Sequence, residues 1–83
     1  MTVTVRYFAS IREAIGQGSE VVDTAATTLG ALRDELIARG GAHASSLARG
    51  RAVRMALNQT LSDESATLAD GAEVAFFPPV TGG

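Results

Sequence analysis

The chain has 83 residues and a formal net charge of -2, and 46% of its residues are hydrophobic while 19% are charged. This composition is typical of one folded globular domain, and the length leaves no room for a second. The weak negative charge argues against nucleic acid or an anionic membrane as a partner. The sequence has no signal peptide and no apolar run of about 20 residues, so it predicts a cytoplasmic protein that does not span a membrane.

Two residue types are missing, because the chain contains neither cysteine nor lysine. It therefore has no disulfide, no thiolate nucleophile, no cysteine-ligated metal and no Schiff-base lysine. The one histidine, His43, stands in the polar run GGAHASS with no second type of ligand nearby, and we interpret it as a solvated loop residue. The sequence predicts no metal site, no bound cofactor and no self-contained catalysis.

The first part of the chain predicts a strand, a short helix and a second strand. Residues 2–8 alternate in polarity, which is typical of a half-buried strand. Ser10 is placed to cap a short helix that Gly16 and Gly18 end. Residues 20–23 then predict a second strand at hairpin distance from the first.

The main helix is predicted to follow Thr27 or Thr28, either of which can cap it through its hydroxyl. Glu35 and Arg39 are spaced to form an exposed ion pair one turn apart, and the pair Gly40-Gly41 ends the helix. Leucines spaced three and four residues apart form the apolar stripe of this helix: Leu29, Leu32 and Leu36.

A polar loop follows, and the rest of the chain predicts strands joined by turns. Residues 52–57 predict a third strand, and Asn58-Gln59 predict a turn into a short strand around Leu61. Asp70-Gly71 is another turn signal, and residues 72–77 predict the last strand. This order favours an α+β fold, a mixed sheet of four or five strands with one main helix packed across one face.

All four aromatic residues fall in the first and last predicted strands. The alternation directs Tyr7 and Phe76 toward the core, and it directs Phe8 and Phe77 toward the other face. Large aromatic rings on an exposed face, joined by Leu61, form a candidate protein-binding patch. The alternative is that the strand ends curl and both rings cover the edge of the core.

The last residues, PPVTGG, suit a tail that leaves a folded body of residues 1–79 and enters a narrow channel. Pro78 and Pro79 end the last strand and favour an extended chain. The tail, residues 80–83, spans about 13 Å when extended, and its glycines lack the Cβ that would obstruct a close approach. The reactive group of such a tail is the C-terminal carboxylate of Gly83. A flexible chain end without a function is the alternative.

The sequence resembles the small, sulfur-carrying subunit of molybdopterin synthase, within the ubiquitin-like β-grasp group. The resemblance is densest in the segments LNQTL and DGAEVAFFPPVTGG, and it extends to VRYFASIREAIG and TLGALRDEL. Residues 38–51 do not contribute to it. The resemblance implies a β-grasp fold for residues 1–79.

The resemblance also implies that the chain is a carrier and not an enzyme on its own. A ubiquitin-activating-type enzyme would use ATP to adenylate the carboxylate of Gly83, and a sulfur donor protein would convert the adenylate to a thiocarboxylate. The tail would then enter the large subunit of the synthase, in a heterotetramer, and give its sulfur to cyclic pyranopterin monophosphate. ATP would be bound by the activating partner and not by this chain.

Carried over to this sequence, the resemblance makes Gly83 the modified residue and Gly82 the residue that keeps the approach narrow. Contact with the large subunit is expected from the patch and the tail: Phe8, Leu61, Phe77, Pro78, Pro79, Val80 and Thr81. Three alternatives stay open. They are the sulfur carrier of thiamine synthesis, a ubiquitin-like modifier that is joined to lysines of other proteins, and an interaction domain without a carrier role.

Overall fold

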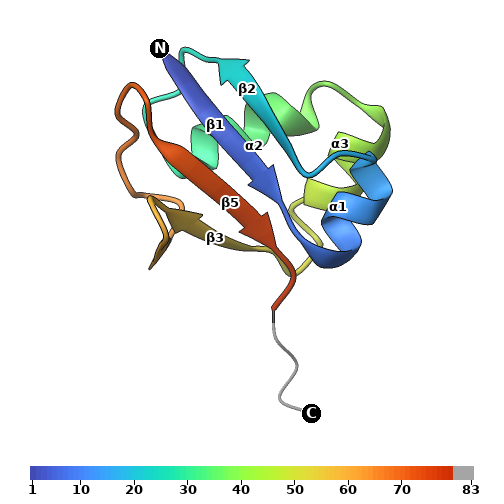
Figure 1. Ribbon diagram of the computed structural model, residues 1–83. Coiled ribbons are helices and arrows are strands. Elements are labelled where there is room, and N and C mark those ends of the chain that lie inside the picture. Colours follow the sequence, from blue (N-terminus) through green and yellow to red (C-terminus); the bar gives the residue numbers. More distant parts are fainter. Residues whose placement is uncertain (80–83) are drawn as a thin grey trace.

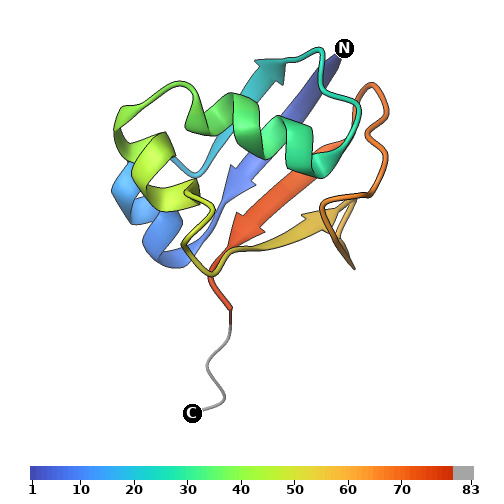
Figure 2. The same cartoon turned by 180° about the vertical axis from the view of Figure 1, so that it is seen from behind.

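The structure is a computed structural model, and it describes residues 1–79 of the chain. The tail expected over residues 80–83 lies outside the described residues. The strands form one five-stranded sheet of order β2-β1-β5-β3-β4, and the helices lie against one of its faces (Figure 1 and Figure 2). The elements are β1 (Thr2–Tyr7), α1 (Ala9–Ile15), β2 (Ser19–Asp23), α2 (Leu29–Ile37), α3 (Gly41–Leu47), β3 (Arg54–Leu57), β4 (Thr60–Ser62) and β5 (Glu73–Phe77).

The centre of the sheet is the parallel pair of β1 and β5, in which Val5 lies opposite Val74 and Tyr7 opposite Phe76. These four side chains are at most 1% exposed. The remaining neighbours in the sheet, β2 beside β1, β3 beside β5 and β4 beside β3, pair antiparallel. The sheet is therefore mixed, as the sequence predicts, and its most buried strands are the two with the clearest alternation.

The inner face of the sheet is covered by α2, which crosses the strands (Figure 2). The predicted leucine stripe is confirmed, because Leu29, Leu32 and Leu36 are at most 1% exposed. The hydroxyl of Thr28 accepts a hydrogen bond of 3.2 Å from the Ala31 amide. Thr28, rather than Thr27, is therefore the cap that fixes the start of this helix.

The predicted turn at Asp70-Gly71 is also confirmed, and it ties the beginning of β5 to the beginning of β1. Gly71 has φ 81°, a left-handed conformation that favours glycine. Its amide donates to the Thr2 carbonyl at 2.7 Å, and the Thr2 amide donates to the Asp70 carboxylate at 2.7 Å. The turn thus helps to set the register of the two central strands.

The start of α1 differs from the prediction. Phe8 occupies the N-cap position in an extended conformation without a capping side chain, so the prediction that Ser10 caps this helix is wrong. The helix begins directly after β1, and Ala9 makes the bend with φ 51°, which leaves Ser10 inside the first turn. The third strand also begins later than predicted, at Arg54 rather than at residue 52.

Residues 41–47 form α3, where the sequence predicted a polar loop. Ser46 and Leu47 are buried there. The guanidinium of Arg33, a buried residue of α2, donates to the carbonyls of Leu47 and Ala48 at 2.7 and 2.8 Å. This helix was missed because its sequence is polar, and the contacts that hold it come from another helix.

The Glu20 carboxylate, on β2, is contacted by three side chains from other parts of the chain. Tyr7 donates to it at 2.7 Å, Arg39 donates at 2.6 Å, and His43 Nε2 lies 2.9 Å from it. The ring of His43 also packs edge-on against Tyr7, with a centroid distance of 5.8 Å. The interpretation of His43 as a solvated loop residue is wrong, and so is the pairing of Arg39 with Glu35. Both errors arise because Glu20 is remote in sequence and close in space.

We predict that Glu20→Gln lowers the free energy of unfolding by about 2 kcal/mol at neutral pH, because a partly buried, hydrogen-bonded charge is lost. Burial by itself would raise the pKa of Glu20, but the hydrogen bonds from Arg39, His43 and Tyr7 outweigh it and hold this pKa at about 2. Because the ordinary pKa is 4.5, this stabilisation is complete above about pH 4.5 and is lost as the pH falls toward 2.

Urea unfolding from about pH 2 to pH 7 tests this pH dependence. The stability difference between the native chain and Glu20→Gln should shrink below about pH 4.5. The control is Glu13→Gln, which changes an exposed glutamate of α1. A difference that is constant with pH would contradict the prediction.

Adjacent aromatic residues on β5 are predicted to differ sharply in their contribution to stability. Phe76 is 0% exposed, whereas Phe77 points to the other face. Phe76→Ala should cost about 3–5 kcal/mol and Phe77→Ala less than about 1 kcal/mol, because only the first leaves a core cavity. Thermal unfolding of both variants measures this. Equal losses would favour the alternative in which both rings cover the core.

Candidate functional site

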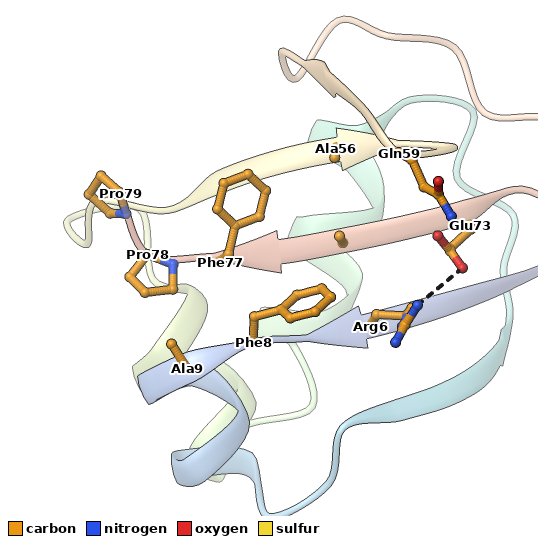
Figure 3. A pocket seen from close by; sticks show the side chains of 10 residues that line it. Arg6, Phe8, Ala9, Ala56, Gln59, Glu73, Phe77, Pro78 and Pro79 are labelled. Atoms are coloured by element: carbon orange, nitrogen blue, oxygen red, sulfur yellow. Dashed lines mark ion pairs between the residues drawn. The ribbon is translucent and has the colours of Figure 1, made fainter. Parts of the chain in front are cut away.

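The outer face of the sheet, which is turned away from the helices, carries a hollow of about 760 Å³ near the end of β5 (Figure 3). We call it the outer hollow. Phe8 and Phe77 form its aromatic walls, and both come from the ends of the central strands. Phe8 is 39% exposed. The structure therefore brings together the two rings that the sequence directed to this face.

The floor of the outer hollow is made by Ala56 and Ala75. These residues lie directly opposite each other in the pairing of β3 with β5, so both side chains point to the same face. Larger side chains surround them. Because the side chains of Ala56 and Ala75 are small, they create the depth of the hollow.

The rim of the outer hollow is polar on the side away from the prolines. Arg6 and Glu73 form an ion pair of 3.7 Å across β1 and β5 (Figure 3), and the Arg6 guanidinium lies 5.4 Å from the centre of the Phe8 ring. Gln59 completes this rim. The opposite charges lie side by side, so the rim has no net charge.

The predicted turn at Asn58-Gln59 fixes this rim to the sheet. Asn58 and Gln59 both have positive φ, 50° and 69°, as a tight hairpin turn requires. The Asn58 amide donates to the Glu73 carbonyl at 2.8 Å, and the Glu73 amide donates to the Asn58 side chain at 2.9 Å. The side chain thus continues the pairing of β3 and β5 beyond the strand end.

Leu61 lies on the same face but outside the lining of the outer hollow. It is opposite Ala56 in the pairing of β3 with β4 and is 62% exposed. It lines a second groove, together with Arg54 and other residues of this edge. Of the three patch residues, Phe8 and Phe77 form one site, and Leu61 extends the apolar surface toward β4.

The chain leaves the sheet at the outer hollow. β5 ends at Phe77, as the sequence predicts, and Pro78 and Pro79 line the hollow. The remaining predicted site residues lie outside the described residues: Val80, Thr81, Gly82 and Gly83. The described part of the site is thus an apolar surface at the root of the expected tail.

Sequence reasoning missed the two alanines and Gln59 as parts of this site. Alternation along the last strand places Ala75 on the same face as Phe77. No such signal identifies Ala56 or Gln59, because only strand pairing shows what they face. In the described range, 1–79, no three side chains are grouped as metal ligands would be, and no helix is long and apolar enough to cross a membrane.

The geometry of the outer hollow suits contact more than catalysis. Its walls and floor are apolar, and Arg6 and Glu73 form an ion pair within the rim. The buried Tyr7 hydroxyl, whose pKa is raised by burial and by Glu20, lies on the inner side of the sheet with the Glu20 cluster. An apolar surface of this kind is typical of protein–protein interfaces.

Comparison with known proteins gives consistent matches. The ThiS family model matches residues 5–83. The molybdopterin synthase sulfur carrier subunit of Escherichia coli K12 is 42% identical over 81 residues, which cover 98% of this chain and 99% of that relative. The crystal structure of SAMP1 from Haloferax volcanii is 26% identical, with a TM-score of 0.80 and full coverage of both chains.

A further solved structure is the complex of subunits 1 and 2 of molybdopterin-converting factor from Helicobacter pylori 26695. A chain in it is 30% identical to this one, with a TM-score of 0.70 and full coverage of both chains. These neighbours confirm the ubiquitin-like β-grasp fold that the resemblance implied. Because the family model spans nearly all of the sequence and the relatives match over almost their whole lengths, this chain belongs to the ThiS family.

Proposed function

We propose that this chain is the sulfur-carrier subunit of a molybdopterin synthase. The observation that carries the proposal is the 42% identity, over 98% of this chain, to a relative named as that subunit. The outer hollow supports it, because a carrier must be recognised by other proteins while its reactive group stays accessible. The chain would then be a non-catalytic part of a larger enzyme, in the cytoplasmic setting that the sequence predicts.

The reactive group in this proposal is the C-terminal carboxylate of Gly83. An adenylating enzyme of the ubiquitin-activating type would bind ATP, and a carboxylate oxygen would attack the α-phosphate with loss of pyrophosphate. A sulfur donor protein would then supply sulfur at the oxidation level of sulfide, which forms a bond to the acyl carbon while AMP leaves. The product is a thiocarboxylate at Gly83, so a chain without cysteine can carry sulfur on its backbone.

The acceptor in this proposal is cyclic pyranopterin monophosphate, held by the large subunit of the synthase in a heterotetramer. The large subunit would contact the outer face, with Phe8, Leu61 and Phe77 as the apolar anchors and Pro78 and Pro79 at the root of the tail. Val80, Thr81 and Gly82 would line the path of the tail. The Helicobacter pylori structure, whose name describes a complex of subunits 1 and 2, supports a two-protein assembly of this kind.

We predict that the chain gains about 16 Da when it is incubated with ATP, its adenylating enzyme and a sulfur donor, because sulfur replaces one oxygen. Intact-mass spectrometry measures the change. The gain should be absent without ATP, and a chain shortened by Gly83 should gain none. The shortened chain should unfold at the same temperature as the native one. A native chain that keeps its mass under these conditions would contradict the proposal.

A protein modifier is the second candidate, because a structural neighbour with the same fold is named small archaeal modifier protein 1. In that case the activated carboxylate would be joined to lysines of other proteins, and a ladder of conjugates would appear in place of the mass gain. The sulfur carrier of thiamine synthesis uses the same activation, so it would show the same mass gain. Sulfur transfer to the pterin precursor in the presence of the large subunit separates it from the main proposal.

Phe77→Ala should weaken binding of the large subunit by about 2 kcal/mol, which is about 30-fold in Kd, because an aromatic anchor is removed from the interface. Isothermal titration calorimetry measures this. The matched control is Val21→Ala, which removes an apolar side chain that is 70% exposed on the same face and lies on β2, outside the outer hollow. An unchanged Kd for Phe77→Ala would remove this ring from the interface.

A further inference from the structure

The floor of the outer hollow has an unusual composition for the middle of a sheet. Ala56 and Ala75 are direct partners on β3 and β5, and the same row continues to Arg6 on one side and Leu61 on the other. Alanine is depleted in strands because it packs little surface. Two facing alanines between larger neighbours therefore leave room for a side chain from outside.

The side chains that surround the hollow differ between its two ends. Phe8 and Phe77 stand on the side of the hollow where the chain leaves the sheet, and Glu73 and Gln59 stand on the other side (Figure 3). Pro78 and Pro79 extend the aromatic wall outward (Figure 3). The space is therefore open to solvent, apolar at the end where the chain leaves the sheet, and continuous with Pro78 and Pro79.

The charges of the rim indicate what kind of group fits. Arg6 and Glu73 are 3.7 Å apart, and Arg6 is also held over the Phe8 ring. Each charge has an opposite charge beside it, so neither stands alone at the rim. The chemistry of the hollow thus favours an uncharged, apolar occupant.

We propose that the outer hollow is a socket for a large apolar side chain of the protein that receives the tail. This inference rests on the proposed function, and it assigns to Ala56 and Ala75 the role of setting the depth of the socket. The partner is the protein that receives the tail, because the hollow is continuous with the prolines from which the tail begins. Any protein that takes up the tail beyond Pro79 must lie against the two prolines, and these prolines are part of the same apolar surface.

The inference is tested by filling the socket from within. In Ala75→Leu an isobutyl group replaces the methyl group on the floor, and Ala56→Leu does the same from the other strand. Each variant should raise the Kd for the large subunit by about tenfold or more, because the partner's side chain can no longer enter. The thermal unfolding midpoint should stay close to that of the native chain, because both side chains lie on the outer face.

Two further variants sharpen the test. Val21→Leu introduces the same final side chain on the same face outside the socket, and it should leave the Kd within about twofold of the native value. Truncation to alanine of the partner side chain that enters the socket should weaken binding of the native chain but improve binding of Ala75→Leu. An alanine scan of the apolar surface of the large subunit identifies that side chain.

The outcomes separate the two proposals. If the native chain binds no large subunit, the proposed function fails. If the native chain binds and both leucine variants bind equally well, the socket is wrong and the proposed function stands. If the leucine variants change only self-association, measured by sedimentation, or only binding of a small apolar dye, the occupant is a second copy or a small molecule, and the assignment to the partner is overturned.

Discussion

The parallel pairing of β1 with β5 is the interaction on which the rest of the structure depends. Its register places Val5 opposite Val74 and Tyr7 opposite Phe76, and all four side chains are buried beneath the helices. Because side chains alternate along a strand, the same register directs Phe77 to the opposite face. A shift by one residue would exchange the core with the outer face. The hydrogen bonds of this one strand pair therefore fix both the residues that form the core and the residues that face outward for recognition.

Because the core lies on the inner face, the outer face of the sheet is available for recognition. The inner face needs large apolar side chains for stability, so it is not free to adapt to a partner. The outer face carries small residues, Ala56 and Ala75, at positions in strands where β-branched and aromatic residues are more common. A backbone carboxylate needs no supporting side chains to be activated by another protein. In the proposed function the folded body therefore contributes recognition, and the chain end contributes chemistry.

Buried and partly buried charged side chains hold the helices in place around this sheet. Glu20 joins β2 to the turn after α2 through Arg39 and to α3 through His43. Arg33 of α2 holds the end of α3 by donating to the carbonyls of Leu47 and Ala48. Such groups are costly to bury unless each donor and acceptor has a partner. Here the partners come from elements that are far apart in sequence, so the groups specify how the helices pack.

The sequence by itself determined the features that depend on near neighbours. Alternation in β1 and β5, the leucine stripe of α2, a threonine cap at its start, the Asp70-Gly71 turn and the stop at Pro78 all follow from local sterics and hydrogen bonding. The tertiary structure alone decided the partners of Glu20, the helix around His43 and the meeting of Ala56 with Ala75. These features depend on contacts between segments that only the completed sheet brings together, and no local pattern encodes such contacts.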